Sequence, residues 1–420
     1  MKKIIYPLQK DTIVEEDHIA LAQWINGNLF STPKNSTATL SIASSQPIEY
    51  TKLLPHLTMG PLVKQFEDKW SDWLGVKYSV SCNSGSSANL LMYYTLLRSG
   101  RLKNKKIIVP SAAWVTTIAP AIQLGFEPIM CEADKETFGL DTEHLEKLLK
   151  KHKPSTVIMV QVLGLPNDMK QIMKLKKKYK FFLLEDTCAA MGSRYKGRKL
   201  GTYGDMASIS TYFGHQFSTI EGGLVSTNNK EFYNLLIMLR SHGWVSGLDT
   251  KTRSNLLKKY KIADIGTHFI FCEPGFNFRL TDLQAFIGIR QLEKMDWLVE
   301  NRSRNHNLYR NLLSPNFDVQ AYDNKSTICS IHFCVLAKNK EERVKIITAL
   351  EDNGIETRPF TSGNQGLHPY WFREYGKFSA PMADRLYYSG FFLPNYPTLS
   401  KKDVEYICSV ATRTALKNRS

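Results

Sequence analysis

The stretch STYFGHQFSTIEGG, residues 210–223, decides the fold of this chain. Its first four residues, Ser210 to Phe213, include the β-branched and aromatic types that favour a strand. Its last three residues, Glu-Gly-Gly, favour a turn. His215 lies between these two parts, directly after a glycine, and the stretch contains no lysine. The role of this histidine depends on the chain around it.

The residues before this stretch alternate between short apolar runs and helical patterns. Such an alternation predicts an α/β fold, in which a largely parallel sheet carries helices on both faces. Ligands of such sheets bind beyond the carboxyl ends of the strands. The expected strands cover residues 77–82, 105–110, 127–133, 155–164 and 181–186.

The length of 420 residues favours two or three domains. We predict a large domain over residues 1–290, followed by a connector helix and a smaller α+β domain over residues 291–420. Within the large domain, residues 31–57 are rich in Ser, Thr and Pro and indicate an inserted loop or lid. Residues 246–264 are polar and predict a surface excursion. The pattern over residues 281–313 predicts one long helix.

The net charge of +16 raises the question of a nucleic-acid partner. The basic runs 146–153 and 174–180 are typical of solvated helix faces or helix ends. Neither run has the interleaved aromatic residues of a protein that binds single strands. We therefore expect no nucleic acid. Positive potential also attracts small anionic substrates such as nucleotide diphosphates.

Segments for a membrane or for secretion are not expected. No segment approaches the about 20 uninterrupted apolar residues that span a bilayer, and acids directly follow a short apolar run at the N-terminus. We expect a cytoplasmic protein with no membrane partner. The seven cysteines are scattered and form no C-x-x-C pair, which disfavours a disulfide framework and a metal site.

Three features stand near the ends of expected strands. NSGSSANL, residues 83–90, opens a helix, where Gly85 lets free N–H groups approach an anion, although an ordinary helix cap also explains it. Trp114 is either a core residue or an aromatic plate for a planar ring. Asp186 ends an apolar strand and either caps the next turn or pairs with the protonated ring nitrogen of pyridoxal phosphate (PLP).

These features, in this order, together with GFNFRLTDLQAFIGIRQLEKM (residues 275–295), resemble the DegT/DnrJ/EryC1/StrS sugar aminotransferase family over nearly the whole chain. The resemblance implies the fold-type-I PLP-dependent transferase fold, which is like that of aspartate aminotransferase. The family pattern is S-F-x-x-x-K, with G-E-G-G six residues after the lysine. Ser210 and the Glu-Gly-Gly turn match it, whereas Ile220 replaces the first glycine and His215 replaces the lysine.

An imidazole cannot form the imine that a lysine makes with PLP, but it can move protons near neutral pH. Within the family, a histidine at this place marks the 3-dehydratases of nucleotide-linked 4-keto-6-deoxy sugars. Four motifs are similar to the GDP-sugar members that form colitose, a deoxysugar of lipopolysaccharide O-antigens. They are TMGPLVKQFE (58–67), SGSSANLLM (84–92), LRSHGW (239–244) and RPFTSGN (358–364).

The resemblance implies that L-glutamate converts PLP into pyridoxamine phosphate (PMP), without covalent attachment through a lysine. The amine of PMP would condense with the C4 ketone of the sugar, while His215 moves a proton and assists departure of the C3 hydroxyl. Hydrolysis of the product would give a 3-deoxy ketosugar and ammonia. A second histidine-containing branch carries a cysteine-ligated [2Fe–2S] cluster. Here Cys272 stands alone before Cys329, so we expect no Fe–S cluster.

The resemblance also assigns roles to single residues. Trp114 would stack on the cofactor ring, Asp186 would pair with its nitrogen, and His215 is the expected catalytic residue. A homodimer with shared active sites is implied, because Asn277 would reach the phosphate from the neighbouring subunit. The other cofactor-binding residues would be Gly85, Ser86, Ser87 and Ser210, and the substrate-binding residues Glu221, His242, Arg279 and Arg358.

Two departures from the family pattern leave other readings open. Ala189 stands where aminotransferases of the family carry Gln and colitose-type dehydratases carry Glu, and residues 31–57 resemble an insertion. In the alternatives to a dehydratase, the chain catalyses another PMP-dependent reaction of a ketosugar, is an aminotransferase with a lysine from elsewhere, or binds a sugar nucleotide without turnover. A dehydratase removes the 3-hydroxyl and releases ammonia, a transferase leaves an amino sugar with that hydroxyl, and a binding protein does neither.

Overall fold

The computed structural model describes residues 14–17, 19–22, 58–262 and 269–417. The expected insertion at residues 31–57 lies outside the described residues. Two sheets organise the described chain, and a two-stranded ribbon of β6 (Arg194–Tyr195) and β7 (Arg198–Lys199) accompanies them.

The larger sheet has seven strands in the order β1-β9-β8-β5-β4-β2-β3. Its strands are parallel except that β9 runs antiparallel to both of its neighbours, β1 and β8. The largely parallel sheet of an α/β fold is therefore confirmed. The strands are β1 (Tyr78–Cys82), β2 (Lys106–Pro110), β3 (Glu127–Cys131), β4 (Thr156–Val160), β5 (Phe182–Asp186), β8 (Met206–Ser210) and β9 (Gly223–Thr227).

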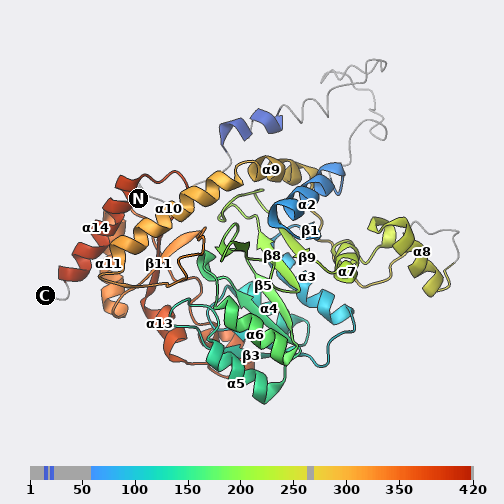
Figure 1. Ribbon diagram of the computed structural model, residues 1–420, viewed down its shortest axis with the longest axis horizontal. Helices are drawn as coiled ribbons and strands as arrows, with labels where there is room; N and C mark the ends of the chain where they lie inside the picture. The colour runs from blue at the N-terminus through green and yellow to red at the C-terminus, as the bar shows by residue number, and fades with distance from the viewer. Residues whose placement is uncertain (1–13, 18, 23–57, 263–268, 418–420) are drawn as a thin grey trace.

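Helices cover both faces of this sheet (Figure 1). Because successive side chains of a strand point to opposite faces, Ile107 of β2 packs into one apolar cluster and Ile108 into another. The first cluster receives side chains from α3, α4 and α7, and the second from α5 and α6. These helices are α3 (Gly85–Arg98), α4 (Val115–Gln123), α5 (Thr142–His152), α6 (Met169–Tyr179) and α7 (Lys230–Arg240).

The prediction of a single helix over residues 281–313 is wrong, because the structure has two helices there, α9 (Asp282–Leu292) and α10 (Met295–Leu313). The two helices have different packing partners: α9 contacts α2 (Pro61–Leu74), whereas α10 contacts α14 (Lys401–Lys417). At the break, the amine of Lys294 donates to Asp17 at 2.7 Å. Helical periodicity continues across this break, so the sequence pattern could not reveal it.

The smaller sheet is antiparallel, with the order β10-β11-β13-β12. Side chains of α10, α11 and α14 form an apolar cluster with it, as expected for an α+β unit. The division at residues 290 and 291 stays a prediction. The strands are β10 (Asp318–Val319), β11 (His332–Leu336), β12 (Arg358–Pro359) and β13 (Gly390–Pro394); the helices are α11 (Lys340–Asp352), α12 (Pro369–Tyr375) and α13 (Pro381–Ser389).

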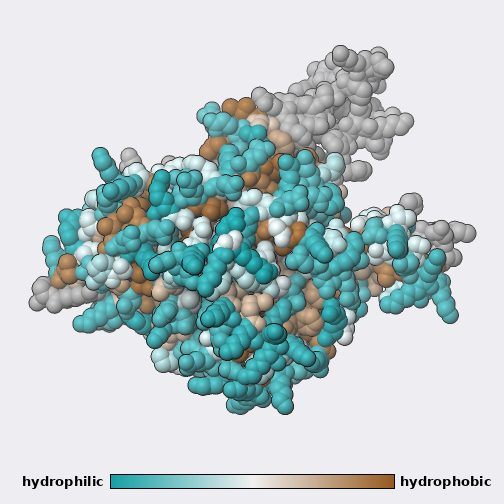
Figure 2. Space-filling view, viewed as in Figure 1, coloured by the Kyte–Doolittle hydropathy of each residue, from teal (hydrophilic) through white to brown (hydrophobic). Residues whose placement is uncertain are grey.

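The surface agrees with the interpretation of the basic runs. The region over α5 and α6 is largely hydrophilic in the space-filling view (Figure 2), and the last turn of each helix carries lysines. The polar excursion carries α8 (Thr250–Lys259), which projects away from the body (Figure 1). Within the described ranges, no helix is long and apolar enough to cross a bilayer, and no group of His, Cys, Asp and Glu is arranged to hold a metal ion.

Candidate active site

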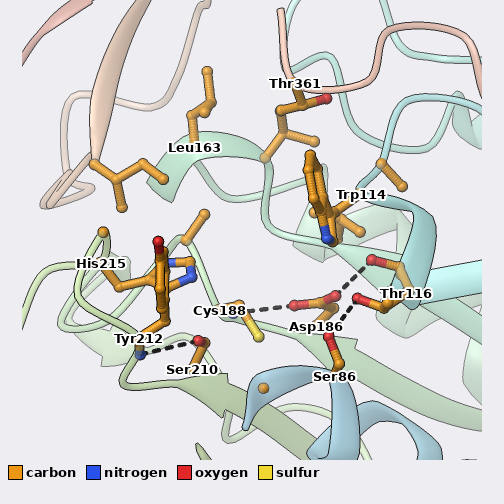
Figure 3. A pocket seen from close by; sticks show the side chains of 18 of the residues that line it. Ser86, Trp114, Thr116, Leu163, Asp186, Cys188, Ser210, Tyr212, His215 and Thr361 are labelled. Atoms are coloured by element: carbon orange, nitrogen blue, oxygen red, sulfur yellow. Dashed lines mark hydrogen bonds between the residues drawn. The ribbon is translucent and has the colours of Figure 1, made fainter. Parts of the chain in front are cut away.

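A cavity of about 550 Å³ opens at the carboxyl ends of β5 and β8, between the two sheets (Figure 3). The large-sheet side contributes the start of α3, the start of α4 and the turn after β5. The other side contributes residues from β11, β12 and β13. The lining includes eight residues predicted from sequence, namely Gly85, Ser86, Trp114, Asp186, Ser210, His215, Glu221 and Arg358.

The first turn of α3 forms a cradle for an anion. The Ser84 side chain caps the helix by accepting from the N–H of Ser87 at 3.0 Å. The initial N–H groups of a helix have no intrahelical acceptors and attract anions. Beside them, Ser86 Oγ donates to Thr116 Oγ1 at 2.9 Å. Ser87 does not line the cavity, and its hydroxyl accepts from Ser84 Oγ at 3.0 Å.

Asp186 is a buried carboxylate whose described partners are all neutral. It accepts from Asn89 Nδ2 at 2.9 Å, Thr117 Oγ1 at 2.7 Å and the N–H of Cys188 at 3.1 Å. No ion pair joins it to a cation of the described chain. A buried carboxylate without a cationic partner is costly, so the site suits a ligand that brings a positive charge.

Trp114 is not a core residue, because 59% of its surface is exposed. It lies at the start of α4 and lines the cavity. Figure 3 shows Trp114 and Asp186 on one side of the cavity, with Asp186 below Trp114 in this view, and His215 across from both. The phosphate cradle, the unpaired carboxylate and the exposed ring fit PLP or PMP: Ser86 and Ser210 would hold the phosphate, Asp186 the ring nitrogen, and Trp114 the ring face.

Strand β8 ends at Ser210, so the strand character expected for residues 211–213 is wrong. The chain turns here because its backbone bonds close a loop: Phe213 N–H donates to the carbonyl of Ile220, and His215 N–H to that of Tyr212, both at 3.0 Å. Ile220 has a φ of 72°, a left-handed value. The residue that replaces the family glycine therefore keeps a conformation that favours glycine.

His215 projects from this loop into the cavity (Figure 3). Its Nδ1 atom is buried and has no hydrogen-bond partner among the described residues. Burial lowers the pKa of His215 to about 4; Asp186 and the backbone of Cys188 oppose this shift, whereas Arg302 adds to it. The imidazole is therefore neutral at pH 7 and can accept a proton. No lysine of the described chain lines the cavity.

A model of the DegT/DnrJ/EryC1/StrS aminotransferase family matches residues 46–411. The chain belongs to this family. It is 32% identical over 371 residues to the GDP-4-keto-6-deoxy-D-mannose 3-dehydratase of Yersinia pseudotuberculosis, and the match covers 87% of each protein. It is 28% identical to the GDP-perosamine synthase of Escherichia coli O157:H7, over 83% of this chain and 89% of that one.

A solved structure confirms the aminotransferase-like fold. The E. coli GDP-4-keto-6-deoxy-D-mannose-3-dehydratase with bound hydrated PLP has a TM-score of 0.82 and 27% identity. The similarity covers 98% of this chain and all of that one (100%). The resemblance to the family and the expected fold are thus both confirmed, and this family member shares its fold with a protein known to bind PLP.

Besides Ser87, three predicted residues lie outside the cavity of the single chain: Asn277, His242 and Arg279. They lie near one another, since Ser241 bridges to Asn277 and Arg279 Nε donates to Asn277 Oδ1 at 2.9 Å. The φ of His242 is 61°, and its N–H donates to the carbonyl of Phe276 at 2.6 Å. Their roles, and the second subunit that would bring them into a site, stay predictions.

The structure also adds cavity residues that the sequence reading missed. They come mainly from the smaller sheet and from the turn η1 (Val162–Gly164). The ring of His332 stacks on that of Phe392, with centroids 5.3 Å apart. His332 had a weak signal, as a histidine inside an apolar strand, whereas the aliphatic residues had none. The main additions are Leu163, Ile331, His332, Thr361 and Phe392.

Proposed function

We propose that this protein is a PMP-dependent 3-dehydratase of a nucleotide-linked 4-keto-6-deoxy sugar, with a GDP-linked substrate favoured. The observation that carries the proposal is His215, a neutral imidazole at the family's lysine position, in a cavity without a described lysine. The similarity to a GDP-4-keto-6-deoxy-D-mannose 3-dehydratase supports the same reaction. The 28% identity to a GDP-perosamine synthase favours a sugar aminotransferase as the second candidate.

When bound, PMP would supply an amine for the C4 ketone and an electron sink for loss of the C3 hydroxyl. The cofactor would be held by the start of α3, by Ser210 and by Trp114. Asp186 would pair with the ring nitrogen, and its three neutral hydrogen-bond donors hold the carboxyl group in place for that contact. L-glutamate would renew the amine, and no iron–sulfur cluster is required.

His215 would carry the proton that the reaction has to move. Its pKa of about 4 leaves the imidazole uncharged at neutral pH, so it first accepts a proton and then delivers it to the departing C3 hydroxyl. The low pKa also makes the imidazolium a ready acid. Position matters here, because a proton carrier acts only within hydrogen-bond reach of the reacting atoms.

The substrate would lie between the two sheets. Arg358 lines the cavity, and its side chain is 62% exposed and only weakly engaged with Glu356 at 3.3 Å. It is thus free to bind a diphosphate. In the proposed homodimer, Asn277, His242 and Arg279 of each subunit would serve the site of the other. Glu221 lines the cavity and would contact the sugar.

Mass spectrometry of the sugar product tests the proposal. The protein is incubated with PLP, L-glutamate and freshly made GDP-4-keto-6-deoxymannose. A dehydratase gives a product lighter by one oxygen, together with 2-oxoglutarate and ammonia. An amino sugar that retains its 3-hydroxyl would instead establish a transferase. Sugar-nucleotide binding without any product would identify a binding protein and contradict the proposal.

A further inference from the structure

The residue that follows His215 is a fully buried glutamine whose side-chain amide contacts two distant segments of the chain. The side-chain nitrogen of Gln216 donates to two carbonyls, that of Ala189 at 2.6 Å and that of Cys329 at 2.9 Å. The side-chain oxygen of Gln216, Oε1, has no hydrogen-bond partner among the described residues. One amide group therefore uses both of its N–H bonds to join segments that are far apart in sequence.

One of these carbonyls belongs to a wall of the cavity, and the other lies in the segment that leads into the opposite wall. Ala189 lies in the turn after β5, three residues beyond Asp186, and itself lines the cavity. The backbone of the preceding residue, Cys188, interacts with His215. Two consecutive residues of this turn therefore face two consecutive residues of the loop. Through Gln216, the loop that carries His215 is fixed to the turn that follows Asp186.

Cys329 leads into the other wall. Ile331 and His332, which follow it, line the cavity from the smaller sheet. The N–H of Cys329 is held by Ser193 Oγ at 2.9 Å. A Cβ atom on Gly164 would stand 2.7 Å from Cα of Ser330, so this segment packs tightly on the large-sheet side. Gln216 thus joins the His215 loop to a segment that is already fixed.

The other side-chain anchors of the loop lie on either side of the histidine. Phe217 is buried among apolar side chains, and the hydroxyls of Thr211 and Thr219 lie 2.6 Å apart. Gly214, the residue before His215, has no side chain to anchor. The Gln216 amide is therefore the nearest side-chain anchor to the imidazole on the loop.

We propose that Gln216 is a positioning residue, which holds His215 at a fixed place between the Asp186 turn and the segment that carries His332. Its effect on turnover rests on the proposed function, whereas its effect on the imidazole does not. A carboxylate at position 216 would remove both N–H donors and repel both carbonyls. An apolar side chain of similar length would remove the bonds without adding charge.

The test uses Gln216→Met and Gln216→Glu, with Gln216→Asn as a milder variant whose shorter amide reaches one carbonyl at most. Gln320→Met is the matched control. Gln320 is also buried, and its amide also donates to two carbonyls, those of Thr137 at 2.8 Å and Val162 at 3.4 Å. It does not bind the His215 loop. The control therefore loses the same kind of hydrogen-bond pair outside the His215 loop, at a segment that lines the cavity through Val162.

The first readout is NMR titration of the His215 imidazole in the cofactor-free full-length protein, assigned with His215→Asn. Burial is the main reason that this pKa lies at about 4. When the anchor is lost and the ring gains solvent, the pKa should rise by about one unit or more towards its ordinary value. Gln320→Met should leave it unchanged. Folded Gln216 variants in which His215 titrates as in the wild type would overturn the proposal, as would an equal shift in the control.

The second readout is turnover. In the Gln216 variants, kcat for ammonia release should fall about tenfold or more, because a misplaced proton carrier loses reach, while KM for the sugar nucleotide changes by less than about threefold. An equal loss in Gln320→Met would overturn the proposal. Should the wild type release no ammonia from any 4-keto sugar nucleotide, the proposed function fails, and the titration alone still decides the role of Gln216.

Discussion

A Cβ atom placed on Gly85 would lie 2.5 Å from Cβ of Ser210. The start of α3 therefore meets the end of β8 without room for a side chain. This contact brings the free N–H groups of the helix to the strand end from which the His215 loop departs.

Gly85→Ala tests this contact. The added methyl group must push the helix start away from β8, which should lower the free energy of unfolding by about 1–3 kcal/mol. Because the cradle itself moves, affinity for PLP should fall by about tenfold or more. Absorbance titration with PLP and urea unfolding measure the two effects. Wild-type affinity in a folded variant would contradict the cradle.

Asp186→Asn separates charge from shape. The amide fills the same space, but it brings no negative charge to a buried site that has no described cation. In the cofactor-free variant, removal of a costly buried charge is opposed by an amide nitrogen that faces a hydrogen-bond donor, so the free energy of unfolding should change by less than about 3 kcal/mol. Its PLP affinity should fall by about 2 kcal/mol or more, roughly thirtyfold, since the ring nitrogen loses its ionic partner. An unchanged affinity would exclude that pairing.

Trp114→Ala should affect binding and leave the fold intact. The side chain is 59% exposed, so its loss should change the free energy of unfolding by less than about 1 kcal/mol. Loss of a stacked aromatic face should weaken PLP binding by about tenfold. Trp297→Ala provides a matched control, because that tryptophan is 48% exposed and does not line the cavity. Equal PLP affinity in the two variants would contradict stacking by Trp114.

Much of the site follows from sequence because it is local to strand ends. Gly85, Asp186 and Ser210 each follow or end a strand of one parallel sheet, and such ends meet at one edge. The alternation of strands and helices therefore predicts their proximity. His215 could be placed through the family pattern, which names the lysine position and the turn after it.

The rest of the site is set by contacts between distant segments. Leu163, Ile331 and Phe392 enter the cavity only because the smaller sheet packs on the larger one, and apolar side chains carry no signal for that. The contact of Gln216 with Cys329 spans 113 positions and is likewise invisible in the sequence. The early end of β8 at Ser210 was missed because loop bonds override the strand propensity of the residues that follow.

His215→Asn should lower the rate of ammonia release by about a hundredfold or more, because the residue moves a proton. Its PLP affinity should stay within about threefold of the wild-type value, because the residue does not tether the cofactor. The same variant gives a test that needs no substrate. The folded-state pKa of about 4 lies below the value of about 6.5 in an unfolded chain. Between these two pH values the unfolded state binds a proton that the folded state does not bind. The free energy of unfolding therefore falls as the pH is lowered from about 6.5 towards 4.

This loss is specific to the histidine and should vanish in the asparagine variant. Above about pH 6.5 the difference in unfolding free energy between the two proteins should be constant. When the pH is lowered to about 4.5, the free energy of unfolding of the variant should rise relative to that of the wild type by on the order of 1–3 kcal/mol. This range allows for the partial exposure of the histidine ring. His306, whose pKa burial lowers to about 3, is present in both proteins and cancels. Urea unfolding of the cofactor-free proteins at pH 7.5 and 4.5 measures the difference, and parallel curves at both pH values would mean that the imidazole is already hydrated.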